Sequence, residues 1–222
     1  MFLKSEKMKT MKILKNSALI ILLTLLSFSG FAQNGGGKIY LSVSHEVADY
    51  TKWKAAFDEN VSIRMEAGIK DIFAKRDINN TNSVTVFFEV NDLNKAKAFV
   101  SSANLKEAMN KSGVVSDPVF VFYKSDVECT AIDASGLVNT ITHSVKDFSA
   151  WKREYDAGEE LRRNAGIHDN VILRSLADEN NITVLGSSSS AEKLFKFISN
   201  PELKAAMEKA GVISKPEVKI LL

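Results

Sequence analysis

The stretch His45-Glu-Val-Ala-Asp-Tyr-Thr-Lys-Trp-Lys54 recurs 98 residues later as His143-Ser-Val-Lys-Asp-Phe-Ser-Ala-Trp-Lys152. In both copies an aspartate, Asp49 or Asp147, precedes aromatic residues at helical spacing. A carboxylate at that position is a typical N-cap, because it accepts the free amide hydrogens of the first helical turn. The stretch therefore predicts the end of a strand followed by the start of a helix, twice in the chain.

The similarity extends over the whole of both copies. Residues 39–122 and 137–220 share 27 identical residues in 84 pairs aligned without a gap. Self-similarity at a fixed period indicates a duplicated structural unit. The sequence predicts a first repeat at residues 38–123, a linker at 124–136 and a second repeat at 137–222.

Each repeat follows the order β-α-β-β-α-β. Alternating apolar residues predict half-buried strands, and apolar residues at helical spacing predict amphipathic helices. In the first repeat the expected elements are a strand at 39–47, a helix from Asp49 to Gly68, strands at 72–76 and 84–90, a helical stretch at 92–111 broken near Ser102, and a strand at 119–123.

Such a unit is a four-stranded antiparallel sheet with helices on one face, and its other face needs a cover. The second repeat is the obvious cover. The predicted fold is α+β: two tandem ferredoxin-like β-α-β-β-α-β units packed sheet to sheet as an intrachain pseudo-dimeric α/β barrel. The chain would then be a monomer with an internal pseudo-dimer. Ser42, Ser44, Thr140 and Thr142 alternate with apolar strand residues, which leaves room for a partly polar cavity.

The N-terminus has the layout of a secretory signal peptide. Lys9, Lys12 and Lys15 precede an apolar run at 18–26, and small residues follow up to Ala32. This pattern predicts cleavage after Ala32, export to the periplasm or the medium, and no membrane span afterwards. An uncleaved N-terminal anchor is the alternative.

The charge of the mature chain does not favour a nucleic-acid partner. The sequence has 29 basic and 27 acidic residues, and five lysines and one glutamate lie in residues 1–32. The remaining 24 basic and 26 acidic residues give a slightly negative chain, whereas nucleic-acid binding needs clustered basic residues. Cys129 is the only cysteine, so no intrachain disulfide is expected.

Three shared motifs resemble those of a known superfamily. They are Val-x-Asp-(Tyr/Phe)-x-x-Trp-Lys-x-x-(Phe/Tyr)-Asp at 47–58 and 145–156, Ala-Gly-Ile at 67–69 and 165–167, and Met-x-Lys-x-Gly-Val-x-Ser-x-Pro at 109–118 and 207–216. The sequence resembles the dimeric α/β-barrel superfamily, in particular small antibiotic-biosynthesis-monooxygenase-like (cyclase-like) proteins. The resemblance implies that one chain holds both protomers of the usual homodimer.

The same resemblance implies an exported small-molecule-binding barrel. The superfamily includes cofactor-independent oxygenases of aromatic polyketides and haem-degrading enzymes, so a monooxygenase-like activity on a small aromatic or hydrophobic compound is one expectation. The alternative is a non-enzymatic binding or stress-associated module with a packed barrel core. No cofactor and no metal site are predicted.

The candidate site residues occur in pairs, one in each repeat. His45 and His143 are the candidate catalytic residues, since imidazole exchanges protons near neutral pH. The alternative is a buried histidine that hydrogen-bonds to the backbone.

Arg64, Arg162, Arg76 and Arg174 are the candidate ligand-binding residues. The first two lie beside the apolar stripe of a helix and could reach an anionic ligand. The alternative is an arginine that packs its stem and extends its head to water or a carboxylate. Arg76 and Arg174 lie on a strand, and alternation does not tell which face they occupy.

Overall fold

The computed structural model describes residues 37–126 and 132–222. The predicted signal peptide, residues 1–32, lies outside the described residues, as do residues 127–131 of the predicted linker. The described residues belong to one compact unit, Gly35–Leu222. None of the helices in these described ranges is long and apolar enough to cross a membrane.

Both repeats contain the same eight elements in the same order. The first repeat consists of β1 (Ile39–Glu46), α1 (Tyr50–Glu59), α2 (Val61–Glu66), β2 (Ile69–Arg76), β3 (Ser83–Val90), α3 (Leu93–Val100), α4 (Ala103–Lys111) and β4 (Val119–Ser125). The second consists of β5 (Leu137–Ser144), α5 (Phe148–Ala157), α6 (Glu159–Asn164), β6 (Ile167–Ser175), β7 (Asn181–Ser188), α7 (Ala191–Ile198), α8 (Pro201–Lys209) and β8 (Glu217–Leu221).

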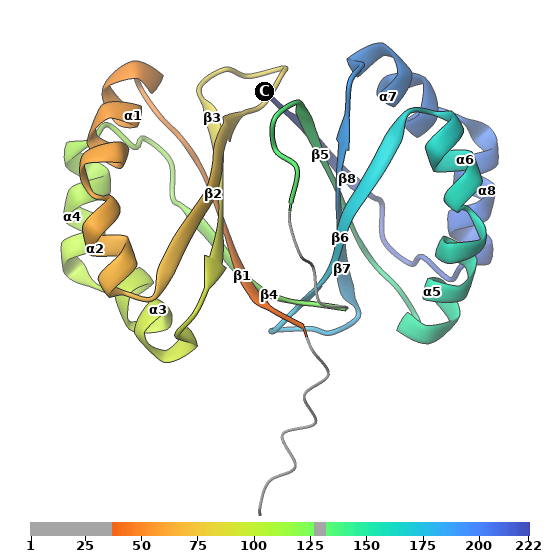
Figure 1. Cartoon of the computed structure of the whole chain (residues 1–222), viewed down its shortest axis with the longest axis horizontal. Coiled ribbons are helices and arrows are strands. Elements are labelled where there is room, and N and C mark those ends of the chain that lie inside the picture. Colours follow the sequence, from red (N-terminus) through yellow and green to blue (C-terminus); the bar gives the residue numbers. More distant parts are fainter. Residues whose placement is uncertain (1–36, 127–131) are drawn as a thin grey trace, which may run out of the picture. The chain divides into compact units, whose positions relative to one another are not determined.

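The eight strands form one continuous sheet in the order β2-β3-β1-β4-β6-β7-β5-β8. β4 pairs with β6 across the repeats, with Tyr123 opposite Ser175. At the other edge the amide of Arg76 donates to Leu222 O at 3.1 Å, and the amide of Leu222 donates to Arg76 O at 2.8 Å. These bonds join the first and last strands of the order, so the sheet closes into a barrel. The predicted fold is confirmed (Figure 1).

The helix signals of the sequence are confirmed at both ends of the first helical segment. The Asp49 carboxylate accepts from the Lys52 amide at 3.1 Å, and the Asp147 carboxylate accepts from the Ala150 amide at 2.6 Å. Gly68 has a φ of 72°, a left-handed conformation that favours glycine. The segment is not one helix, however. It breaks between α1 and α2, where the Asn60 side chain donates to Ala56 O at 2.7 Å.

The second strand is longer than the sequence predicts, because its alternation is interrupted. β2 begins at Ile69 instead of residue 72, and its register with β3 shifts between Asp71 and Phe73. The equivalent shift in β6 lies between Asp169 and Val171. A bulge places two residues opposite one, so the period-2 pattern fails there.

The apolar core has two kinds of layer. Leu41, Val43 and Val86 pack with Trp53 between the first-repeat sheet and its helices. The opposite face of the strands points into the barrel, where Tyr40 and Phe87 belong to a cluster shared by both repeats. The two faces of β1 therefore line two different spaces, one under the helices and one inside the barrel. The four strands of each repeat are called a sheet below, so the space inside the barrel lies between the two sheets.

Candidate functional site

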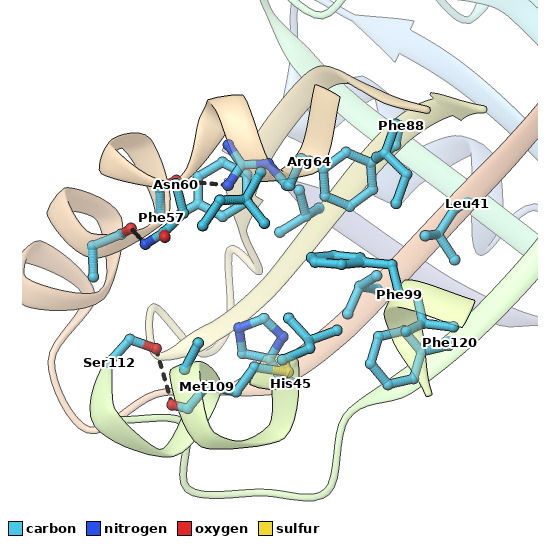
Figure 2. Close-up of a pocket in the computed structure, with 18 of the residues that line it drawn as sticks. Leu41, His45, Phe57, Asn60, Arg64, Phe88, Phe99, Met109, Ser112 and Phe120 are labelled. Carbon is cyan, nitrogen blue, oxygen red and sulfur yellow. Dashed lines mark hydrogen bonds between the residues drawn. The ribbon is translucent and has the colours of Figure 1, made fainter. Parts of the chain in front are cut away.

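Each repeat has a pocket between its sheet and its helices. The pocket of the first repeat, called here the first-repeat pocket, has a volume of about 240 Å³. Its walls are mainly apolar and aromatic, and the polar side chains that reach it include His45, Asn60, Arg64 and Ser112 (Figure 2). Pockets with apolar walls and a few polar groups are typical of small-molecule sites.

His45 is the polar residue that the strand carries into this pocket. It lies near the end of β1 on the same face as Leu41 and Val43, and its ring packs 5.3 Å from that of Trp53. In Figure 2 the ring projects into the space between the helix of Arg64 and the helix of Met109. The residue is 5% exposed, and neither ring nitrogen has a hydrogen-bond partner among the residues that the structure describes. The backbone bond of the alternative interpretation is therefore absent.

Burial controls the charge of this histidine. Desolvation lowers the pKa of His45 from 6.5 to about 4, because a charged ring is unfavourable in apolar surroundings. At neutral pH the ring is uncharged, with one nitrogen as donor and the other as acceptor. The pocket thus offers a neutral hydrogen-bonding group to whatever occupies it.

Arg64 lies in the wall of the same pocket, but its own partners satisfy its charge. Its Nε donates to the Asp71 carboxylate at 2.8 Å, and its Nη1 donates to Phe57 O at 2.7 Å. The guanidinium also stacks over the Phe57 ring at 3.7 Å. Arg162 repeats this arrangement with Asp169 and Tyr155. Both arginines join their helix to the following strand, which agrees with the packing alternative.

Arg76 and Arg174 face the helices instead of the space between the sheets. Arg76 lies over the Tyr50 ring at 4.5 Å, and Arg174 lies over the Phe148 ring at 4.2 Å. Arg174 also donates to Glu179 O at 3.0 Å. The structure therefore groups His45 with Arg64, and His143 with Arg162, and leaves Arg76 and Arg174 out of both pockets.

The pocket of the second repeat is smaller, about 90 Å³. His143 occupies it in the way that His45 occupies the first: it is 3% exposed, its nitrogens have no hydrogen-bond partner within residues 37–126 and 132–222, and burial lowers its pKa to about 4. The walls differ, because Asn139 and Gly186 stand where the first repeat has Leu41 and Phe88. Asn139 is 1% exposed, and its Oδ1 is also without a partner.

The second-repeat pocket has an ion pair at its edge, and the first-repeat pocket has no equivalent of it in the described part of the chain. Glu154 lines this pocket and accepts from Lys209 of α8 at 2.7 Å, which connects α5 to α8. Ala56 stands at the equivalent position of the first repeat. There the equivalent lysine, Lys111, pairs with Glu107 on its own helix. The first-repeat pocket is therefore both larger and free of this connection.

Another cavity, called here the intersheet cavity, lies inside the barrel. It has a volume of about 250 Å³ and is lined by Ser42, Ser44, Thr140 and Thr142, as the alternation in the sequence predicts. The barrel interior is therefore not completely filled by side chains. Tyr123, Glu217 and Lys219 also reach this cavity. Sequence reasoning missed these three, although Lys219 and Glu217 replace Val121 and Val119 of the first repeat and could have been found by comparing the copies.

The chain has the fold of several solved structures at low sequence identity. An anthrone oxidase-like protein has a TM-score of 0.57 at 11% identity, over 83% of this chain and 90% of its own. A candidate monooxygenase from Lactobacillus acidophilus has a TM-score of 0.55 at 14% identity, over 83% and 93%. A haem-binding protein from Thermus thermophilus has a TM-score of 0.52 at 12% identity, over 84% and 92%.

These likenesses show a shared fold, an α+β barrel of ferredoxin-like units, as the resemblance in sequence implies, and nothing about the reaction. No protein-family model matches the sequence, and no curated protein matches it.

The first-repeat pocket does not fit a haem. Its volume is below the roughly 300–1,000 Å³ of pockets for drug-sized ligands, and a haem is larger than most of those. Arg64, the cation in its wall, is already paired with Asp71. Within the described ranges no group of three or more His, Cys, Asp or Glu side chains could hold a metal ion.

Proposed function

We propose that this protein binds one small, mainly apolar molecule per chain, in the first-repeat pocket. The observation that carries the proposal is the neutral ring of His45, buried at 5% exposure with neither nitrogen paired, in a pocket of about 240 Å³. A buried polar group without a partner is unfavourable by about 1–3 kcal/mol. A ligand that hydrogen-bonds to the ring recovers that free energy.

The size and lining of the pocket limit the ligand. A volume of 240 Å³ equals that of about eight liquid water molecules, which suits a compound of one or two rings. Phe57, Phe88 and Phe99 offer aromatic surface for such rings. The ligand that fits best is a small aromatic compound with one hydroxyl or carbonyl group directed at His45.

Binding is better supported than catalysis at this site. A pKa of about 4 makes His45 a weak base, whereas an efficient general base has a pKa near the working pH. A monooxygenase-like reaction rests on the likeness of the fold, which hosts many functions. The proposal is therefore a binding protein for small aromatic compounds.

The second repeat supports a stoichiometry of one. Its pocket is about 90 Å³, and the Glu154–Lys209 ion pair connects the helices beside it. An aromatic compound that fills the first-repeat pocket is too large for this space. His143 then serves as an internal control for His45, since both rings have the same burial and the same lowered pKa.

The experiment compares 2-naphthol with naphthalene, which lacks the hydroxyl, by fluorescence titration and calorimetry. We expect one 2-naphthol per chain, and binding about tenfold weaker in His45→Leu, because one buried hydrogen bond is lost. The His143→Leu variant should bind as the unmodified chain does. Naphthalene should bind both variants alike. Equal loss of 2-naphthol binding in the two variants, or two bound molecules per chain, would refute the proposal.

The proposal includes export, which the sequence of residues 1–32 supports. Lysines followed by an apolar run and by the small residues Gly30 and Ala32 are typical of a cleaved signal peptide. Expression of the full chain, followed by denaturing mass spectrometry of the exported fraction, tests it. A mass that begins at Gln33 is expected, and an intact chain retained in the membrane fraction would contradict both cleavage and release.

A further inference from the structure

The intersheet cavity is separate from the first-repeat pocket, because the two spaces lie on opposite faces of β1. Leu41, Val43 and His45 line the pocket under the helices. Ser42 and Ser44, which alternate with them, line the cavity between the sheets. Successive side chains of a strand point to opposite faces. A ligand of the barrel interior would therefore not contact His45.

Pairs of hydroxyl groups lie in the cavity wall at equivalent positions of the two repeats. Ser44 Oγ lies 3.2 Å from Thr85 Oγ1, and Thr142 Oγ1 lies 2.8 Å from Thr183 Oγ1. The neighbouring hydroxyls of Ser42 and Thr140 also line the cavity, and the structure gives neither of them a hydrogen bond in the described ranges. One unused hydroxyl thus comes from each sheet.

A chain of hydrogen bonds runs from Thr142 and Thr183 of the second repeat to the Tyr123 hydroxyl of the first. Thr183 donates to the Tyr123 hydroxyl oxygen at 3.4 Å, so the proton of Tyr123 is not needed for that bond. Burial raises the pKa of Tyr123, and the phenol remains protonated. Tyr123 is 6% exposed and lines the cavity, where its O–H can donate.

Lys219 supplies the positive charge. Its Nζ reaches from β8 to Ser44 Oγ on β1, in the opposite sheet, at 3.4 Å. Its ion pair with Glu217 measures 3.4 Å, and the Glu217 side chain is 67% exposed. An ion pair this exposed is weak, because water screens it. An ammonium has three N–H donors, so Lys219 can bind an additional acceptor.

Hydrogen-bond donors from both repeats therefore line the intersheet cavity. The Lys219 ammonium and the O–H groups of Tyr123, Ser42 and Thr140 line it from four strands, and the one carboxylate that lines it, Glu217, extends toward solvent. We infer that the intersheet cavity is a second binding site, for a small carboxylate. A cavity of about 250 Å³ accepts a carboxylate with a short carbon chain or a single ring.

The test uses the full mature chain with two probes of the same shape, propionate and its neutral amide, propionamide. Calorimetry measures affinity, and the methyl resonances of Thr140, Thr142 and Thr183 report the location. We expect propionate to bind in the millimolar range and to shift those resonances. Lys219→Met should weaken propionate binding about tenfold, since a charged hydrogen bond is lost, and should leave the weaker binding of propionamide unchanged.

Three variants distinguish binding in the intersheet cavity from binding to exposed lysines and from binding in the first-repeat pocket. Lys204→Met removes an exposed lysine of α8, 81% exposed, and should leave propionate affinity unchanged. Tyr123→Phe provides a second test in case Lys219→Met unfolds, and should also weaken propionate binding. His45→Leu should have no effect on propionate, whatever it does to 2-naphthol. Equal affinities for propionate and propionamide, or equal effects of Lys219→Met and Lys204→Met, would overturn the inference.

Discussion

The two buried histidines should make the protein less stable as the pH falls from 7 to 5. In the unfolded chain a histidine has a pKa of about 6.5, whereas burial lowers the pKa of His45 and His143 to about 4. Between these values the unfolded state binds protons that the folded state does not. Stability is therefore full above pH 6.5 and decreases as the pH falls toward 4.

The magnitude follows from the two pKa values. At pH 5 an unfolded histidine is almost fully protonated, and a buried one with a pKa of about 4 is mostly neutral. The difference lowers the free energy of unfolding by about 2 kcal/mol for each histidine between pH 7 and 5, or about 4 kcal/mol for both.

Urea unfolding at pH 7 and pH 5 measures this loss. The double variant His45→Leu, His143→Leu should lose about 4 kcal/mol less than the unmodified chain over that range, because neither leucine titrates. His168→Gln, at an exposed position of β6, should show the full loss. If the double variant lost as much stability as the unmodified chain, the two histidines would not be the source of the loss, and the lowering of their pKa by burial would be refuted.

Two further substitutions, with a third as a control, test the packing of the first repeat. Asp71→Asn leaves the buried Arg64, whose side chain is 7% exposed, without its carboxylate partner. The substitution should lower the free energy of unfolding by about 2 kcal/mol in urea titrations. No measurable change would show that the guanidinium is solvated. Gly68→Ala should destabilise the chain by about 2 kcal/mol or more, because its φ is 72° and an added Cβ would lie 2.8 Å from Asp92 Cβ. Gly113→Ala, at a φ of 89° with open space around it, should show only the backbone part, about 1 kcal/mol, and equal losses at the two glycines would contradict the clash.

The duplication makes the two pockets a natural comparison within one molecule. Both keep the buried histidine packed on a tryptophan and the arginine–aspartate pair, although Arg64 binds Asp71 through two nitrogens and Arg162 binds Asp169 through one. The first pocket has Leu41 and Ala56 at the positions where the second has Asn139 and Glu154. The shared residues hold the fold of the pocket together, and the differing ones set its volume and polarity. The differences, more than the shared residues, therefore point to what each pocket accepts.

The sequence by itself determined the architecture of this protein. The repeat of 98 residues is visible by comparing the chain with itself, whereas the caps at Asp49 and Asp147 and the left-handed glycines at 68 and 166 are local signals. Local signals depend on hydrogen bonds and side-chain spacing within one element, and these are visible in a linear chain. Closing the barrel with a second copy followed from the need to cover an apolar sheet face.

Only the tertiary structure decided which face each strand presents and which side chains meet. Alternation places His45 and Ser44 on opposite faces, but it does not say which face the helices cover. The bulge at Asp71 depends on the pairing of β2 with β3, so no pattern within one strand predicts it. The reach of Lys219 to Ser44 spans 175 residues of sequence. Contacts at such separation exist only after the sheets have packed, which is why they appear in the structure and not in the sequence.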